Sequence, residues 1–353
     1  MYEQGPIRPP SEASSLLVRV TRNCPWNRCL MCPAYKGTNF SKRTVDEVKK
    51  DIDEMAEDHG RYLERVTSAF LQDADTLIIP TRELLEIIEY LKIKFPNITR
   101  ITTYARAKSM KNKSAESYKS LKQAGLTRIH TGMESGSSRV LKMLQKGSTP
   151  EDILTGGLRV MEAGISLSEY IMPGVGGMTL SKEHALETAG LLNTIRPDYI
   201  RVRTFAMHPK SPMQKMVEEG GTFFPMSDEE IVAEIRLLVS NLDEMHTHFR
   251  CSDFSLNLLM GVDGYLDSQK DEMLQEIDTY LSLSKRQKQA YSFLHRSGHY
   301  FQRLDDFVRD ESMLDQISSE IEKMEKNGKD GFNKYIQHLM SYQLPQPQTD
   351  NWT

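Results

Sequence analysis

The stretch "SLLVRVTRNCPWNRCLMC" (residues 15–32) places three of the chain's four cysteines shortly after an apolar run. The run at 15–20 is rich in Leu and Val and predicts a β-strand. Cys24, Cys29 and Cys32 then fall in the loop that follows this strand. In parallel α/β proteins the loops after the strands form the active-site face. Three thiols in such a loop can bind one metal centre, so we expect the functional site here.

Three alternatives account for these cysteines. A structural zinc ion normally has four protein ligands, and the nearby candidates His59 and Asp46 stand at no typical ligand spacing. Buried cysteines without a ligand are common, but Pro25, Asn27 and Arg28 make this loop a poor core segment. An iron–sulfur cluster ordinarily takes four cysteines. Three therefore suggest a [4Fe–4S] cluster with one iron left open for a substrate or cofactor.

The length and composition of the chain limit the classes of protein to which it can belong. The 353 residues are 39% hydrophobic with a formal net charge of −4, enough for one large domain plus an appendage or for two domains. No stretch reaches the roughly 18–20 apolar residues that cross a bilayer. The first residues lack the pattern of a signal peptide, so we expect a cytoplasmic protein with no membrane contact. The acidic balance makes nucleic acid an unfavoured partner without excluding it.

Short apolar runs alternate with longer amphipathic segments along most of the chain. Expected strands cover 15–20, 65–71, 98–105, 126–133, 165–172 and 198–207. Expected helices cover 44–60, 80–96, 114–125, 137–144, 149–164, 181–195 and 227–245. Such alternation predicts a parallel sheet with helical crossovers. We therefore expect an α/β fold, a partial (β/α)6 TIM-type barrel with a mostly helical C-terminal extension.

The pattern changes beyond residue 250. Residues 249–259 could form one more strand, and 269–340 read as mostly helical. We therefore expect four regions, listed here by residue number: an N-terminal extension at 1–14, a core at 15–260, a helical C-terminal region at 261–340 and a flexible tail at 341–353. The helical region carries no motif of its own, and we expect it to shape or cover a substrate opening.

The cysteine loop resembles that of the radical S-adenosylmethionine (SAM) superfamily. The usual motif has three residues between the first two cysteines, whereas this chain has four, in a CX4CX2C variant. Other stretches resemble the cores of the Elongator catalytic subunit, the methylthiotransferases and the oxygen-independent coproporphyrinogen oxidases. The resemblance covers residues 15–210 well. It implies that Cys24, Cys29 and Cys32 hold a [4Fe–4S] cluster and that SAM binds its open iron.

The resemblance also implies SAM contacts at the ends of two strands. In "FLQDADTL" (70–77), Asp73, Ala74 and Asp75 match the turn that meets the SAM amino group. A solvated loop would explain these residues equally well. In "RIHTGMESGSSRVLKMLQKGST" (128–149), the family pattern makes Glu134 and the neighbouring Ser135 SAM contacts.

Three more positions follow from the same resemblance. Lys146 stands where relatives carry an arginine for the SAM carboxylate, and an exposed helix-end lysine is an equal alternative. Gly174, in "YIMPGVGGMT" (170–179), lets the backbone approach the adenosine closely. Arg203, in "YIRVRTFAM" (199–207), could bind a carboxylate of SAM or of a substrate, or could reach solvent.

The implied reaction is reductive cleavage of SAM to methionine and a 5′-deoxyadenosyl radical, which abstracts hydrogen from an unidentified small molecule. An electron donor such as flavodoxin or ferredoxin is the implied partner. Alternatives are modification of RNA or a polypeptide, and a non-catalytic protein that handles a cluster or heme. Cys251 is a candidate hydrogen-atom donor, although a buried thiol on a further strand is the favoured interpretation.

Overall fold

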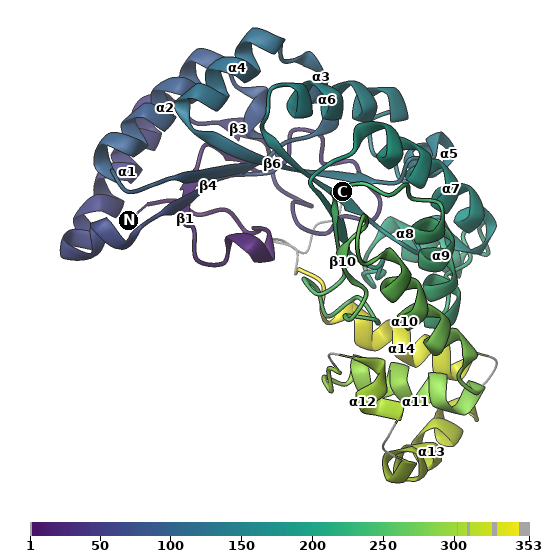
Figure 1. Ribbon diagram of the computed structural model, residues 1–353. Coiled ribbons are helices and arrows are strands. Elements are labelled where there is room, and N and C mark those ends of the chain that lie inside the picture. Colours follow the sequence, from purple (N-terminus) through teal and green to yellow (C-terminus); the bar gives the residue numbers. More distant parts are fainter. Residues whose placement is uncertain (1, 302, 309–310, 327–329, 346–353) are drawn as a thin grey trace. The chain divides into compact units, whose positions relative to one another are not determined.

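The computed structural model describes residues 2–301, 303–308, 311–326 and 330–345, and its main feature is an eight-stranded sheet (Figure 1). Its strand order is β1-β4-β5-β6-β7-β8-β9-β10, with β2 and β3 paired separately. β1, β4, β5 and β6 pair in parallel, as do β8 and β9, whereas β10 runs antiparallel to β9 and β3 antiparallel to β2. The predicted α/β class with a mostly parallel sheet is therefore confirmed.

Seven strands fall on the predicted apolar runs, whereas β2, β3 and β10 were not predicted. Their bounds are β1 (Leu16–Arg19), β2 (Thr21–Arg22), β3 (Ser41–Lys42), β4 (Ser68–Gln72), β5 (Arg100–Tyr104), β6 (Leu126–Glu134), β7 (Ser166–Ile171), β8 (Tyr199–Val202), β9 (His248–Arg250) and β10 (Asp263–Tyr265). The residues of β4, β5 and β7 are almost all buried, as expected of strands covered on both faces.

Several helices begin at side-chain caps that are visible in the sequence. Thr44, Thr149 and Ser227 each form a capping box with the third residue of the helix that follows. The helices that join or flank the strands are α1 (Val45–His59), α2 (Thr81–Lys94), α3 (Ala107–Asn112), α4 (Ala115–Ala124), α5 (Ser138–Met143), α6 (Pro150–Glu162), α7 (Gly177–Ile195), α8 (Pro212–Glu218) and α9 (Asp228–Ser240). The C-terminal helices are α10 (Lys270–Ser282), α11 (Lys285–Arg296), α12 (Leu304–Val308), α13 (Glu311–Glu325) and α14 (Gly331–Ser341).

Two strand predictions were too long. The strand expected over 198–207 ends at Val202, and the one expected over 249–259 is β9 alone. Asn257 gives the reason, because its side-chain amide takes the place of a neighbouring strand. It accepts from the Thr204 amide at 2.8 Å and donates to the Val202 and Cys251 carbonyl oxygens at 2.7 Å. These backbone groups are thereby satisfied outside the sheet.

The described residues divide into two compact units. The first comprises 2–133, 146–169 and 345, and the second comprises 134–145 and the described residues of 170–344. In the first unit, α1, α2 and α4 lie along one face of β1 and β4 (Figure 1). In the second unit, α7 packs on α9 and α9 packs on α10. The predicted four-region division stays a prediction, and most of the predicted tail, at 346–353, lies outside the described residues.

The N-terminal segment is packed against the first unit. The short 3-10 helix η1 (Pro10–Glu12) brings the fully buried Glu12 carboxylate to Arg100 at 2.7 Å and to His130 at 3.3 Å. Ser15 donates a further hydrogen bond at 2.7 Å. Burial alone would raise the pKa of Glu12, but the hydrogen bonds from His130 and Ser15 and the nearby charges of His130 and Arg100 lower it to about 2.

Candidate functional site

The cysteine loop, residues 23–40, connects β2 to β3, the two strands of the small separate sheet. Cys24, Cys29 and Cys32 are all partly exposed, and none of the four cysteines, which all lie in the described part of the chain, forms a disulfide. Asn27 fixes the loop by donating to the Tyr35 carbonyl at 2.6 Å and to the Thr38 carbonyl at 3.2 Å. Its backbone φ of 44° is a left-handed conformation that asparagine tolerates.

Trp26 ties the cysteine loop to the segment before α6. Gly147 lies so close to its indole that a Cβ atom there would stand 2.4 Å from the ring. The Arg28 and Arg106 guanidinium groups lie over the ring at 5.3 and 5.4 Å from its centroid. The Cys29 sulfur also lies 4.0 Å from the Lys146 carbonyl oxygen. The loop is therefore held on the side of Lys146 by packing as well as by hydrogen bonds.

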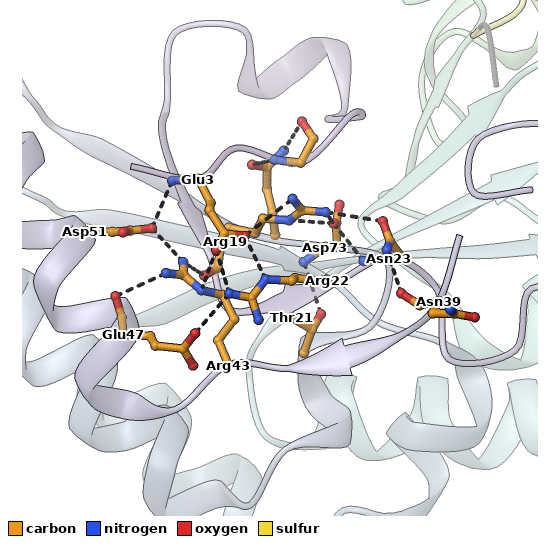
Figure 2. Close-up of polar contacts among 12 residues, drawn as sticks. Glu3, Arg19, Thr21, Arg22, Asn23, Asn39, Arg43, Glu47, Asp51 and Asp73 are labelled. Atoms are coloured by element: carbon orange, nitrogen blue, oxygen red, sulfur yellow. Dashed lines mark hydrogen bonds and ion pairs between the residues drawn. The ribbon is translucent and has the colours of Figure 1, made fainter. Parts of the chain in front are cut away.

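Asp73, at the end of β4, holds the opposite side of the cysteine loop (Figure 2). Its fully buried carboxylate accepts from Arg19 at 3.0 and 2.8 Å and from the Asn23 amide at 3.0 Å. The Tyr35 hydroxyl donates to the other oxygen at 2.9 Å. Burial, and then the Asp73 charge, raise the pKa of Tyr35 well above its usual value. The side chain predicted to meet the SAM amino group is thus paired within the protein.

A second set of charges continues this network to the N-terminal segment (Figure 2). Arg22, two residues before Cys24, donates to Glu3 at 2.8 and 2.5 Å and to Glu47 at 2.9 Å. Arg43 donates to Asp51 at 2.6 Å, and Asp51 accepts from the Glu3 amide at 3.1 Å. The residues on either side of the cysteine loop are therefore tied to α1 and to the first residues of the chain.

Asp75, the next predicted SAM contact, caps a helix. Its buried carboxylate accepts from the Arg106 amide at 3.2 Å and from the Ser109 hydroxyl at 2.6 Å, at the start of α3. Burial raises the pKa of Asp75 to about 6. Ala74, between the two aspartates, is partly exposed. The sequence predicted carboxylates facing a ligand, whereas the structure pairs both carboxylates with the protein.

In the second unit, Glu134 ends β6 with a left-handed backbone, at a φ of 62°. Its carbonyl accepts from the Met172 amide at 3.0 Å. Ser135, the next residue, is fully buried, and its hydroxyl lies 2.8 Å from His184 Nδ1. The sequence predicted both residues as SAM contacts, but it gave no signal for His184 as a partner of Ser135.

The remaining predicted residues of this unit lie near the ends of β7, β8 and β9. Gly174 has a φ of 86°, and its amide donates to Glu234 at 2.7 Å. Arg203 lies with its guanidinium over Phe254, 5.9 Å from the ring centroid. Cys251 is 1% exposed, and burial raises the pKa of its thiol well above the usual value. A buried thiol is what the favoured interpretation of Cys251 expected, and its proposed hydrogen-donor role stays a prediction.

Comparison with known families identifies the loop. Residues 18–189 match the model of the radical SAM superfamily, a range that contains all three loop cysteines. Residues 18–189 form a radical SAM superfamily domain. Among solved radical SAM structures, that of TsrM contains cobalamin and a [4Fe–4S] cluster, and that of OxsB contains aqua-cobalamin and SAM. Three cysteines on one anchored, partly exposed loop supply the donor set that such a cluster with one open iron requires.

The curated relatives of this radical SAM chain are distant and varied. The heme chaperone HemW of Bacillus subtilis is 28% identical over 135 residues, which are 38% of this chain and 34% of that protein. The 4′-phospho-dehydrooxetanocin synthase of Priestia megaterium is 25% identical over 201 residues, 51% of this chain and 27% of that protein. The chain therefore spans about a third or less of the length of these relatives.

Solved structures agree on the radical SAM fold. The cobalamin-dependent SAM radical enzyme OxsB aligns with a TM-score of 0.52 at 14% identity, over 94% of this chain and 58% of that chain. Its complex with aqua-cobalamin and SAM aligns with a TM-score of 0.50 at 16% identity, over 92% of this chain and 52% of that chain. At such identities the likeness shows the fold alone.

The three loop thiols supply the right number of ligands but are not gathered around a common point. No group of three or more His, Cys, Asp or Glu side chains placed to hold a metal ion is present among the described residues. Their helices also include none with the length and apolar character that a membrane crossing requires.

Proposed function

We propose that this chain is a radical SAM enzyme that acts on a small molecule. The observation that carries the proposal is the cysteine loop, anchored on both sides with its three cysteines partly exposed, inside a radical SAM domain. A cluster held by Cys24, Cys29 and Cys32 would supply one electron, taken from a reductant, for cleavage of the SAM S–C5′ bond, which would give methionine and a 5′-deoxyadenosyl radical able to take a hydrogen atom from the substrate. Flavodoxin or ferredoxin is the proposed class of electron donor.

In the first unit, Cys24, Cys29 and Cys32 would hold the cluster, and the strand-end turn would face the SAM amino group. Because Arg19 and Tyr35 already pair with the Asp73 carboxylate, we assign this role to the main chain from Asp73 to Asp75. Ala74 is the partly exposed member of the three. Lys146, partly exposed beside the cysteine loop, would supply a positive charge for the SAM carboxylate.

In the second unit, Glu134, Ser135, Gly174 and Arg203 are the proposed SAM contacts. The left-handed backbone at Glu134 and Gly174 makes two sharp turns directly after β6 and β7. Loops in this position form the ligand-binding face of α/β barrels. Glu134 and Arg203 are partly exposed and offer one negative and one positive side chain. Ser135, being buried, would act through its backbone.

A second candidate function is non-catalytic heme handling, and the 28% identity to the heme chaperone HemW motivates it. A role in RNA modification is the further alternative, raised by 23% identity over 112 residues to a tRNA uridine(34) acetyltransferase. A titration with heme and a salt-dependent tRNA-binding assay separate these candidates from the enzyme. Tight heme binding without SAM cleavage would favour heme handling. Binding of tRNA at low salt would favour RNA modification.

The proposal is tested first on the cysteines. Wild-type protein reconstituted anaerobically with iron and sulfide should hold about four of each per chain. Cys24→Ala, Cys29→Ala and Cys32→Ala should each lose most of this iron, whereas the matched Cys251→Ala should keep it. Full iron retention in all three loop variants would contradict the proposal. The substrate is then sought by incubating the reduced protein with SAM and a cell extract and tracking the metabolite that disappears.

A further inference from the structure

One face of α7 is attached to the turn that follows β6. His184 Nδ1 lies 2.8 Å from the Ser135 hydroxyl, and the Gly136 amide donates to the Thr188 hydroxyl at 2.8 Å. A Cβ atom on Gly136 would stand 2.4 Å from the carbonyl oxygen of Glu187, so only glycine allows this approach. The turn at 134–137 is therefore positioned by a single helix.

The next turn is attached to α9 in a similar way. Glu234 accepts from the Gly174 amide at 2.7 Å, at the left-handed residue of the turn after β7. Its carboxylate also lies 3.6 Å from His184 Nε2. A continuous polar path thus runs from Ser135 through His184 and Glu234 to Gly174, entirely within the second unit.

The hydrogen-bond geometry indicates how His184 connects the two turns. Burial lowers the pKa of His184 to about 4, so the ring is neutral near pH 7. The Ser135 hydroxyl accepts from the Ser137 amide at 3.0 Å and therefore has its own proton to donate to Nδ1. Nδ1 also lies 3.4 Å from the Thr188 hydroxyl, and Nε2 faces the Glu234 carboxylate at 3.6 Å, beyond hydrogen-bond distance.

A purely structural core would not need these groups. His184 and Glu234 are 0% and 3% exposed, and burying a carboxylate without a cation is unfavourable. Burial accordingly raises the pKa of Glu234 to about 7. The two side chains instead hold the turns after β6 and β7, whose residues are the proposed SAM contacts. We propose that His184 and Glu234 are positioning residues that fix these turns for SAM binding, an inference that rests on the proposed function.

The test measures SAM affinity on the oxidised, cluster-loaded protein, which does not turn over. Equilibrium dialysis with labelled SAM should show about tenfold weaker binding for Glu234→Ala and His184→Ala, because each leaves a buried partner unpaired. Glu234→Gln keeps an oxygen for the Gly174 amide and should recover most of the affinity. In an assay of SAM cleavage, Glu234→Ala and His184→Ala should raise the KM for SAM with little change in kcat. The matched control is His295→Ala, which removes an equally buried histidine of α11.

The outcomes separate the two claims. Weakened SAM binding in the Glu234 and His184 variants, with iron content equal to wild type and with the His295 variant binding normally, supports the inference. SAM affinity equal to that of the His295 variant overturns it while leaving the proposed function intact. If an alanine variant does not fold, His184→Phe and Glu234→Leu give the same comparison, because each fills the space and removes the polar atoms that contact the turns. Wild-type protein that holds its cluster and fails to bind SAM overturns both claims.

Discussion

Asp73 shows how one buried charge can organise the loop that carries the chemistry. Its carboxylate binds Arg19 from the preceding strand and both Asn23 and Tyr35 from the cysteine loop. The sequence could place Asp73 at a strand end and suggest a ligand there. It could not show the pairing with Arg19, because that contact joins residues 54 positions apart. Glu12 is a second example, since its partner His130 is 118 positions away.

Replacing Asp73 should weaken both the fold and cluster binding. In Asp73→Asn the Arg19 guanidinium loses its buried counter-charge, so we expect the free energy of unfolding to fall by about 3 kcal/mol. We also expect less iron after reconstitution, because the Asn23 side of the loop is released. Asp53→Asn is the control, since Asp53 forms an exposed ion pair with Lys94 whose loss should cost less than about 1 kcal/mol. Equal stability and iron content in the two variants would contradict this role.

The pKa of Glu12 predicts a pH dependence of stability. Because the folded-state pKa is about 2, below the ordinary value of 4.5, the carboxylate stabilises the fold fully above pH 4.5 and loses this effect as pH falls toward 2. Glu12→Gln should therefore be less stable than wild type by on the order of 3 kcal/mol at pH 7. Urea unfolding between pH 7 and pH 3 should show the difference shrinking below pH 4.5. A difference that stays constant with pH would rule out this linkage.

At the scale of elements, the cysteine loop depends on its neighbours more than on its own sequence. Trp26 packs on Gly147, and Arg106 from the start of α3 covers the ring. Helix caps such as Thr44 and Thr149 were readable from the sequence because they act within four residues. The strands predicted at 198–207 and 249–259 were too long because the Asn257 side chain binds the backbone after β8 and after β9. Local signals could be read from the sequence, whereas these long-range contacts could not.

Gly147→Ala tests the packing of the loop. Gly147 has a φ of 72°, and an added methyl group would overlap the Trp26 ring. We expect a loss of about 2–4 kcal/mol, from the strained backbone plus the clash, and a lower iron content. Gly164→Ala is a matched control, because Gly164 has a φ of 69° with nothing within 4 Å of an added Cβ. Its loss should be about 1 kcal/mol with normal iron, measured by thermal unfolding and iron assay. Similar losses of stability and iron in both variants would contradict the Trp26 contact.

At the scale of the whole molecule, the order of strands and helices predicted the fold class. The alternation predicted a mostly parallel sheet, and the resemblance of the cysteine loop and four later stretches indicated the radical SAM superfamily. The sequence left the substrate open, and the varied relatives leave it open as well. Nor did it predict the packed N-terminal segment or the buried path from Ser135 to Gly174. Both depend on contacts between residues far apart in the chain.

The central claim is that this chain cleaves SAM. The most direct measurement is the amount of 5′-deoxyadenosine and methionine formed by anaerobically reconstituted wild-type protein with SAM and dithionite. We predict the two products in equal amounts, with formation abolished in Cys24→Ala. Protein that holds about four irons per chain and forms no 5′-deoxyadenosine, with or without cell extract, would contradict the account.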